Sequence, residues 1–146
     1  MLIEFSCSNF RSIKNEVLFS MRAGMDDTYA DTLIGFDKFN ILRTAVIYGA
    51  NGSGKSNFIK ALQFVRDFVV KSISFQPGEP LKFQPHKMAS ENDTVFRLQF
   101  IKDGLRFEYG FAHNRNVVTS EHLYVYPLGR QQKIFERTSD AFIAGD

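Results

Sequence analysis

The residues best suited to chemistry lie together in residues 49–56 (GANGSGKS), which match the phosphate-binding pattern G-x-x-x-x-G-K-[ST] at every fixed position. Glycines let the backbone wrap so that successive N–H groups surround a β-phosphate. The ammonium of Lys55 would then reach the β- and γ-phosphates, and the hydroxyl of Ser56 would bind Mg²⁺. A chain of this length shows the pattern by chance about half a per cent of the time at average amino-acid usage. The pattern therefore predicts a nucleotide site, the alternative being a glycine-rich turn without a ligand.

A loop of this kind needs a buried strand before it and a helix that opens within it. Residues 43–48 (RTAVIY) are a short, β-branched, apolar run that ends at a glycine, which is typical of a covered parallel strand. From Gly54 onward, apolar residues recur at intervals of three and four, which predicts an amphipathic helix about 30 Å long. The residues of this stripe are Phe58, Leu62, Val65, Val69 and Ile73.

The composition is that of a single globular domain. With 146 residues, including 16 phenylalanines and five tyrosines, the chain is expected to form one core with an aromatic-rich interior. Cys7 is the single cysteine, lies in an alternating segment, and is expected to be a buried, unreactive thiol. No apolar run approaches the length that crosses a bilayer, and the N-terminus has no signal-peptide pattern. We therefore expect a cytoplasmic protein without a membrane partner.

The formal net charge is only +2, but the charges are unevenly distributed. Residues 41–90 carry seven Lys or Arg residues and two acids, whereas the flanking parts are mildly acidic. A positive middle suits a polyphosphate and could also contact nucleic acid. Because there is no dense basic cluster, an ordinary solvated surface fits the pattern equally well.

The chain divides into three parts. Residues 1–75 hold two N-terminal strands (2–10 and 17–21), an irregular stretch (24–40), and the strand, loop and helix described above. Residues 76–92 are expected to be a connecting loop because prolines, Pro77 among them, interrupt them. Residues 93–140 predict an antiparallel β-meander, in which the turn dipeptide Asp103-Gly104 joins two alternating strands.

Together these features resemble the N-terminal lobe of an ATP-binding-cassette (ABC) type head from the SMC-like ATPases. That group includes chromosome-maintenance and recombination-repair ATPases and AAA-family ATPases of bacterial anti-phage defence. The resemblance is carried by residues 2–5 (LIEF), 9–12 (NFRS), 48–57 (YGANGSGKSN) and the meander, and it spans roughly the whole chain as half a head. It implies an α/β (α+β) fold of the P-loop NTPase class, with residues 1–146 as the N-terminal lobe around a central strand-loop-helix.

The resemblance also implies a set of site residues, with ATP and Mg²⁺ as cofactors and Ser56 as the metal ligand. The N–H groups of residues 51–57 would cradle the phosphates at the positive end of the helix. Arg11 and Ser12 would reach the nucleotide from the first turn, although a surface arginine on a hairpin is an equal alternative for Arg11. The implied nucleotide-binding residues are Arg11, Ser12, Asn51, Gly52, Ser53, Gly54, Lys55, Ser56 and Asn57.

Several parts of a catalytic site of this group are not found in the sequence. No apolar strand ends in Asp-Glu to hold Mg²⁺ and orient water, and neither a Leu-Ser-Gly-Gly-type signature nor a switch histidine is seen, so no catalytic residue is assigned. The glutamine that contacts Mg²⁺ in this group could be Gln84 or Gln99. In the group, a second half of the head follows a long helical insertion, and two heads sandwich ATP. We therefore expect that this chain is half of a head, that an insertion could begin near Asp146, and that ATP turnover by the chain alone is negligible.

Two sets of residues could suggest a metal site, but neither has the required spacing. The histidines lie far apart without partnered carboxylates, and they are His86, His113 and His122. The acids of the irregular stretch lack the glycine and glutamate of a calcium loop, and they are Asp26, Asp27 and Asp31. Ordinary histidines and surface carboxylates are expected.

The expected function is ATP binding, with hydrolysis once a C-terminal lobe completes the head and two heads form a homodimer. Such an ATPase would drive or regulate an effector in anti-phage defence or DNA processing, with DNA and a nuclease or other effector subunit as partners. One alternative is a non-catalytic module in which nucleotide regulates binding to DNA or to a partner. A small P-loop kinase is a weaker alternative, because further βα units around a mostly parallel sheet would be expected.

Overall fold

A computed structural model describes residues 1–26, 28–76 and 78–145 of the chain. Asp27, Pro77 and Asp146, which enter the expectations above, lie outside the described residues. The strands are β1 (Leu2–Ser8), β2 (Val17–Ser20), β3 (Ile34–Phe36), β4 (Phe39–Ile41), β5 (Thr94–Lys102), β6 (Leu105–His113), β7 (Val118–Tyr126), β8 (Gln132–Thr138) and β9 (Phe142–Ala144). The helices are α1 (Lys55–Lys71) and the short 3₁₀ turns η1 (Ala30–Thr32), η2 (Ser72–Ser74), η3 (Lys87–Ala89) and η4 (Pro127–Gly129). No helix of the described residues is long and apolar enough to cross a membrane.

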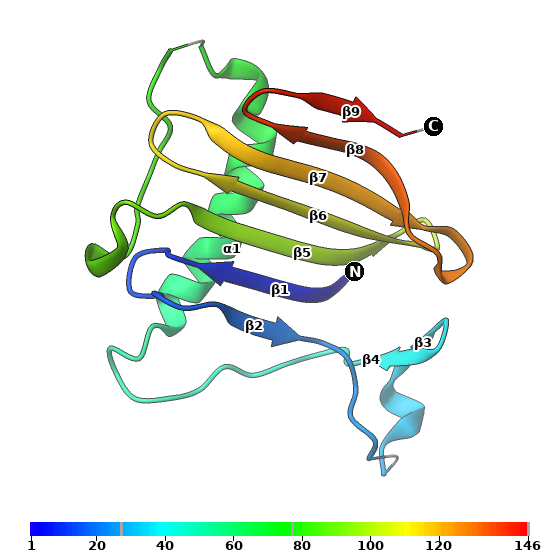
Figure 1. Cartoon of the computed structure of the whole chain (residues 1–146). Coiled ribbons are helices and arrows are strands. Elements are labelled where there is room, and N and C mark those ends of the chain that lie inside the picture. The colour runs from blue at the N-terminus through cyan, green and yellow to red at the C-terminus, as the bar shows by residue number, and fades with distance from the viewer. Residues whose placement is uncertain (27, 77, 146) are drawn as a thin grey trace.

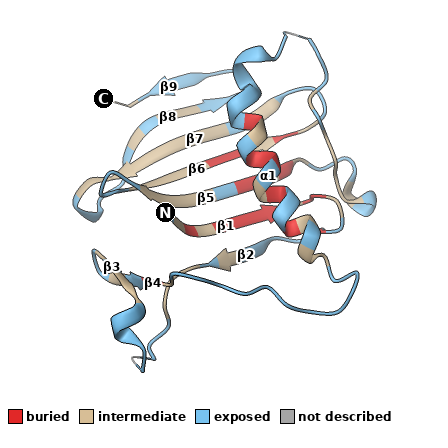
Figure 2. Ribbon diagram, turned by 180° about the vertical axis from the view of Figure 1, so that it is seen from behind, coloured by how far each residue is buried: buried red, intermediate tan, exposed pale blue. Residues whose placement is uncertain are grey.

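A seven-stranded sheet in the order β2-β1-β5-β6-β7-β8-β9 organises the molecule. Its strands lie side by side in Figure 1, and α1 crosses one of its faces, as Figure 2 shows. The predicted hairpin is confirmed, because β5 and β6 pair over their whole length. Asp103 and Gly104 at its tip have φ angles of 51° and 75°, the left-handed pair that a two-residue hairpin turn needs. The fold is therefore mixed α/β, and its sheet is built from antiparallel pairs.

The core lies between α1 and the sheet, where Figure 2 shows the buried residues. Most of its side chains are aromatic. Phe68 stacks on Phe111 with ring centroids 4.6 Å apart, and Phe64 stacks on Phe96 at 5.3 Å. The residues that α1 buries are Phe58, Ala61, Phe64, Val65 and Phe68. These contacts fix the axis of α1 on the sheet, and with it the direction in which the helix N-terminus points.

Cys7 belongs to this core and is 1% exposed. Burial, together with the nearby carboxylate of Glu16, raises the pKa of its thiol to about 12. The thiol stays protonated at neutral pH, and the thiolate is the reactive form of cysteine. The expectation that this thiol is buried is confirmed, and its raised pKa agrees with the expected low reactivity.

The helix ends earlier than its apolar stripe predicts. It stops at Lys71 after 17 residues, about 25 Å, and Ile73 lies beyond it in η2 with 95% of its surface exposed. The hydroxyl of Ser72 donates to the carbonyl of Val69, and that of Ser74 donates to the carbonyl of Lys71. Serine hydroxyls that bind local carbonyls in this way compete with helix continuation.

The parallel strand predicted at residues 43–48 is wrong for this structure, because these residues form no strand. Val46, Ile47 and Tyr48 are 79%, 40% and 90% exposed. A covered parallel strand takes its hydrogen bonds from a parallel neighbour, whereas every strand pair among the described residues is antiparallel. The apolar run therefore has neither a backbone partner nor a cover.

The stretch expected to be irregular, residues 24–40, contains most of a small hairpin, which is a second correction. β3 and β4 pair with each other, and the rings of Phe36 and Phe39 lie 5.8 Å apart at its tip. Asp37 in the turn has a φ of 50°, a conformation that Asp adopts more readily than most residues. Strands of three residues are too short to show a clear alternation, so the sequence pattern missed them.

His113 lies among the core aromatics at the end of β6. It is 1% exposed, and its ring stacks on that of Phe64 with centroids 5.5 Å apart. Burial lowers the pKa of its imidazole below 6.5. Between that lowered pKa and 6.5 the unfolded chain therefore binds a proton that the folded chain does not, so the free energy of unfolding falls as the pH falls.

We predict that acidification from about pH 7.5 to about pH 5.5 destabilises the chain, with a contribution from His113 of up to about 1.4 kcal/mol per pH unit. His113→Phe keeps an aromatic ring but cannot titrate, so its unfolding free energy should fall less steeply. Urea denaturation at each pH measures the slope. His122→Gln is the comparison: burial also lowers the pKa of this less deeply buried histidine, so the variant should lose part of the slope, but less of it than His113→Phe. A wild-type slope in His113→Phe would contradict the assignment.

Candidate functional site

The loop of residues 49–54 leads directly into α1 and turns through two glycines with left-handed backbone. Gly52 has a φ of 81° and Gly54 a φ of 98°. Gly54 caps α1, and the N–H groups of Asn57 and Phe58 both donate to its carbonyl, at 2.9 and 3.0 Å. A side chain at either glycine would be strained, so the backbone fits the phosphate cradle that the motif predicts.

Lys55 is the first residue of α1, and its side chain turns back across the loop. Its Nζ donates to the carbonyl oxygens of Gly49 and Ala50, each at 2.8 Å. Helix geometry leaves the N–H groups of Lys55 and Ser56 without an acceptor inside the helix. A cation and free N–H groups at the positive end of a helix form an anion-binding concavity. A phosphate bound there would replace the two loop carbonyls as the partner of the ammonium.

The turn of residues 9–13 docks against the start of α1. Asn57 donates from Nδ2 to the hydroxyl of Ser12 at 2.8 Å. A Cβ on Gly54 would lie only 3.5 Å from the same hydroxyl. The structure therefore brings Ser12 to the cradle formed by residues 52–57, and its contact with a nucleotide stays a prediction.

Asn9 holds this turn in place. It is 4% exposed, and its backbone has a φ of 53°. Its Oδ1 accepts from the N–H of His86 at 2.9 Å. Its Nδ2 donates to three carbonyl oxygens, those of Ala89 at 2.9 Å, Asn92 at 2.6 Å and Asp93 at 3.3 Å. One side chain thus joins the first turn to a loop that is 77 to 84 positions away in the chain.

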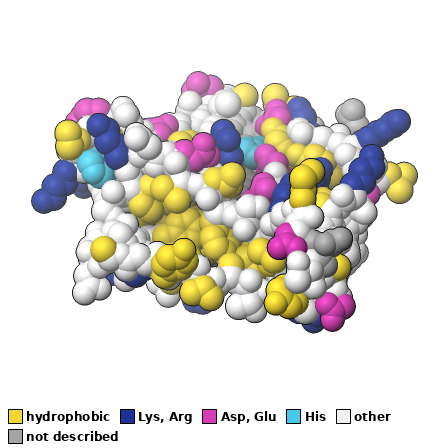
Figure 3. Space-filling model, turned by 90° about the horizontal axis from the view of Figure 1, so that it is seen from below, with side chains coloured by type: hydrophobic (Ala, Val, Ile, Leu, Met, Phe, Trp, Pro, Cys, Tyr) yellow, Lys and Arg dark blue, Asp and Glu magenta, His cyan; other side chains and the backbone are white. Residues whose placement is uncertain are grey.

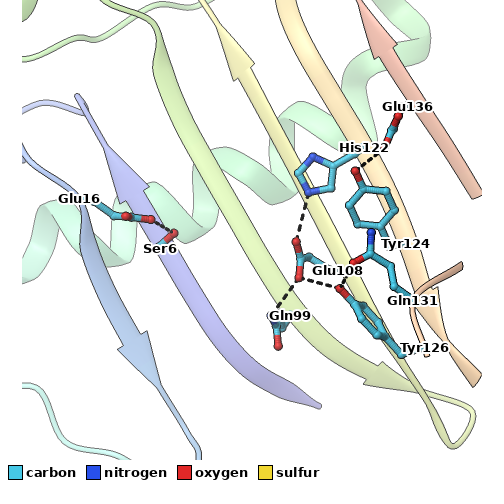
Figure 4. A network of polar contacts seen from close by, with 9 residues as sticks. All are labelled: Ser6, Glu16, Gln99, Glu108, His122, Tyr124, Tyr126, Gln131 and Glu136. Atoms are coloured by element: carbon cyan, nitrogen blue, oxygen red, sulfur yellow. Dashed lines mark hydrogen bonds and ion pairs between the residues drawn. The ribbon is translucent and has the colours of Figure 1, made fainter. Parts of the chain in front are cut away.

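Arg11 contacts residues 78–84, a segment that we call the strap. Its Nε and Nη2 donate to Oε1 of Gln84 at 3.1 and 3.0 Å, and its backbone N–H donates to the Gln84 carbonyl at 2.8 Å. Gln84 therefore lies beside the turn that carries Ser12. Gln99 lies on the opposite face of the sheet, where it donates to Glu108 at 3.0 Å (Figure 4). The geometry separates the two glutamines, and a metal contact of Gln84 stays a prediction.

A hollow of about 490 Å³ lies between the loop and the edge strand β2. Gly54 and Lys55 line one side, and Leu18, Phe19 and Tyr48 form an apolar part of the lining. Residues 12–17, which are mostly polar, also line the hollow. The side of the molecule that carries β2, seen from below in Figure 3, shows a broad gathering of hydrophobic side chains. An apolar wall beside a phosphate cradle suits the flat base of a nucleotide. Sequence reasoning missed this wall because β2 lies some 30 positions before the loop.

The sheet face away from α1 carries a polar network (Figure 4). Glu108 accepts from the hydroxyl of Tyr126 at 3.2 Å and lies 3.5 Å from Nε2 of His122. The hydroxyl of Tyr124 donates to Glu136 at 2.5 Å, and this bond raises the pKa of Tyr124 to about 12. Across the described ranges of the chain, no group of three or more His, Cys, Asp or Glu side chains is placed to hold a metal ion. The polar side chains of this network therefore bind one another on the sheet face that α1 does not cover.

We predict that Asn9→Ala lowers the free energy of unfolding by about 2–4 kcal/mol, because it leaves buried backbone groups unpaired and puts alanine at a positive φ. Asn9→Gly removes the same side chain without the backbone strain, so it should lose about 1 kcal/mol less. Chemical denaturation followed by circular dichroism measures both. Asn116→Ala, in an exposed loop, is the control and should change the stability little. Wild-type stability in Asn9→Ala would show that the turn is held by other contacts.

The sequence of the chain matches a known protein family. No curated protein matches the chain. A family model described as "AAA domain, putative AbiEii toxin, Type IV TA system" matches residues 45–145, well over half of the chain. The matched region includes the glycine loop, α1, the strap and the meander through β9. With the glycine loop and Lys55 at the start of α1 in place, the chain belongs to this family of AAA domains of the P-loop ATPase type.

Proposed function

We propose that the domain binds ATP and Mg²⁺ through residues 49–57, as the N-terminal lobe of an SMC-like, ABC-type ATPase head. The observation that carries the proposal is the position of Lys55, whose ammonium lies over the loop at the helix end where N–H groups are free. Ser56, the next residue, would supply its hydroxyl to Mg²⁺. Arg11 and Ser12 would complete the binding site from the neighbouring turn. Membership of the AAA family supports ATP as the nucleotide.

The exposed run before the loop supports completion by a second lobe. Val46 and Tyr48 are 79% and 90% exposed although residues 43–48 have the composition of a covered parallel strand. A parallel strand from a C-terminal lobe would supply both the backbone partner and the cover. Its arrival would extend the fold on the side of α1 that the antiparallel sheet does not reach.

Hydrolysis is proposed to need that second lobe and a second head. Glu16 is the acid among the residues that line the hollow beside the loop, and its carboxylate accepts from Ser6 at 2.8 Å. Phosphoryl transfer depends on positioned water and charge stabilisation, which the cradle alone does not provide. In a homodimer that sandwiches ATP, each head would contribute the missing groups to the other's nucleotide.

The family description supports a setting in bacterial defence, since it names the AbiEii toxin and a type IV toxin–antitoxin system. We propose that ATP binding drives or regulates an effector in anti-phage defence or DNA processing, in the cytoplasm. DNA and a nuclease or other effector subunit are the proposed partners. The alternative is a non-catalytic module in which nucleotide regulates binding to DNA or to a partner. The antiparallel second half argues against a small P-loop kinase.

We predict that Lys55→Ala weakens binding of a fluorescent ATP analogue with Mg²⁺ by about ten- to a hundredfold, because a charge-assisted contact with the phosphates is lost. Titration followed by fluorescence anisotropy gives both dissociation constants. Lys60→Ala is the matched control, because Lys60 is exposed on the same helix and lies outside the loop. Equal affinity in wild type and Lys55→Ala would remove the basis for the proposed site.

We predict that the chain alone releases phosphate from ATP at a rate indistinguishable from buffer. A coupled phosphate assay with Lys55→Ala as the blank measures the rate. Clear turnover that Lys55→Ala abolishes would show that the lobe hydrolyses ATP unaided, and it would overturn the requirement for a second lobe while leaving ATP binding intact.

A further inference from the structure

We propose that the groove between α1 and the strap is a docking site for an extended, acidic segment of a partner protein that carries an apolar side chain at its centre. The groove has a volume of about 440 Å³. It lies outside the nucleotide loop, and the inference does not rest on ATP binding.

The walls of the groove are fixed by backbone hydrogen bonds. One wall is α1. Phe64 and Phe68, at the base of this wall, form the floor of the groove. The opposite wall is the strap, and the N–H of Leu81 in the strap donates to the carbonyl of Arg115 at 2.7 Å. The Gln84 carbonyl at the C-terminal end of the strap accepts from the N–H of Arg11, in the turn of residues 9–13, at 2.8 Å. A strap held at its middle and at one end needs little ordering when a partner binds.

The rim of the groove is positively charged. Lys60 and Lys71 lie at its α1 side and Lys82 lies on the strap, and all three are exposed. None of the three forms an ion pair with any residue that the structure describes. The groove's acid on α1, Asp67, is 3.3 Å from Arg66 and thus already has a cationic neighbour. The lining as a whole has four cationic side chains, the three lysines and Arg11, against the two carboxylates of Asp67 and Glu79. This positive excess favours an acidic partner.

The dimensions favour an extended peptide over a single nucleotide. Lys60 and Lys71 are separated by eleven positions of α1, about 16 Å along the helix axis. An extended chain covers that span with about five residues. Acidic residues near both ends could therefore meet the lysines at once while a central apolar side chain contacts the floor.

The floor favours a peptide over single-stranded nucleic acid. Phe10 is 1% exposed, and Phe64 and Phe68 are each 8% exposed, so their ring faces are covered by the core and are not free to stack on bases. Phe75, at 40% exposed, offers apolar contact at the edge of the groove. Glu79 and Asp67 also line it, and their carboxylates can accept from the N–H groups of a peptide backbone, which a phosphate backbone lacks.

The test uses the chain without nucleotide and a fluorescein-labelled peptide of sequence Glu-Asp-Phe-Leu-Asp-Glu, followed by fluorescence anisotropy and by amide NMR shifts of the labelled protein. We expect binding that weakens with added salt, with the largest shifts along α1 and the strap. The double variant Lys71→Glu/Lys82→Glu should lower the affinity at least about tenfold, because each reversal replaces an attraction by a repulsion. Lys14→Glu/Lys102→Glu makes the same change in net charge away from the groove and should bind like wild type.

A separate variant tests the apolar contact of the peptide with Phe75. Phe75→Ser should weaken binding of the same peptide, and amide spectra show that each variant is folded. No shift in the groove at millimolar peptide would overturn the proposal, and so would equal loss of affinity in both double variants. Preferential binding of a labelled oligo(dT) strand in the groove would replace the peptide by nucleic acid and would also overturn it. Because nucleotide is left out, none of these outcomes depends on the ATP site.

Discussion

The packing of α1 on the sheet is the interaction on which the candidate site depends. Phe58 lies in the first turns of the helix, and its ring meets that of Phe5 at 5.3 Å and that of Phe19 at 5.6 Å. Burying one such ring stabilises the fold by roughly 1.5–3 kcal/mol, and Phe64 and Phe68 repeat the contact further along. The N-terminus of α1 is thereby fixed over β1 and β2. Lys55 and the free N–H groups take their positions from this packing.

The same helix is covered on one side only, and this explains where sequence reasoning failed. Residues 43–48 were expected to form a covered strand because most of their side chains are apolar. A strand also needs a neighbour, which periodicity cannot supply, and the described residues pair only in antiparallel fashion. Val69 and Val70 at the other end of α1 are likewise exposed, at 44% and 67%. Val69 and Val70 line an open hollow with Leu98 and Leu123 of the sheet. Both exposed sets are therefore apolar surface that the described residues leave uncovered.

Local signals, in contrast, were predictive. The Asp103-Gly104 turn set the register of β5 and β6. Phe58 and Val65 of the predicted stripe are buried on α1, whereas Val69 of the same stripe is 44% exposed. The contacts that bring the turn of residues 9–13 to the site are of another kind, since they join residues 45 or more positions apart. The sequence marks residues 9–12 as a motif, but nothing in it reveals that Asn9 binds the loop at residues 86–93 or that Arg11 selects Gln84 rather than Gln99. Such pairings follow from the sheet topology, which places β1 beside β5.

The turn of residues 9–13 also sets a condition on the role expected for Arg11. Ser12 and Arg11 are adjacent, yet Ser12 bonds to the start of α1 and Arg11 bonds to the strap. The guanidinium is held by the neutral amide oxygen of Gln84, and a phosphate offers a stronger, charge-assisted partner for the same donors. For Arg11 to contact a nucleotide, its side chain must therefore leave Gln84, whereas the backbone bond between the two residues can stay in place. The exchange would release the Gln84 side chain at the moment when a phosphate arrives, so the two residues are linked in any role that either has at this site.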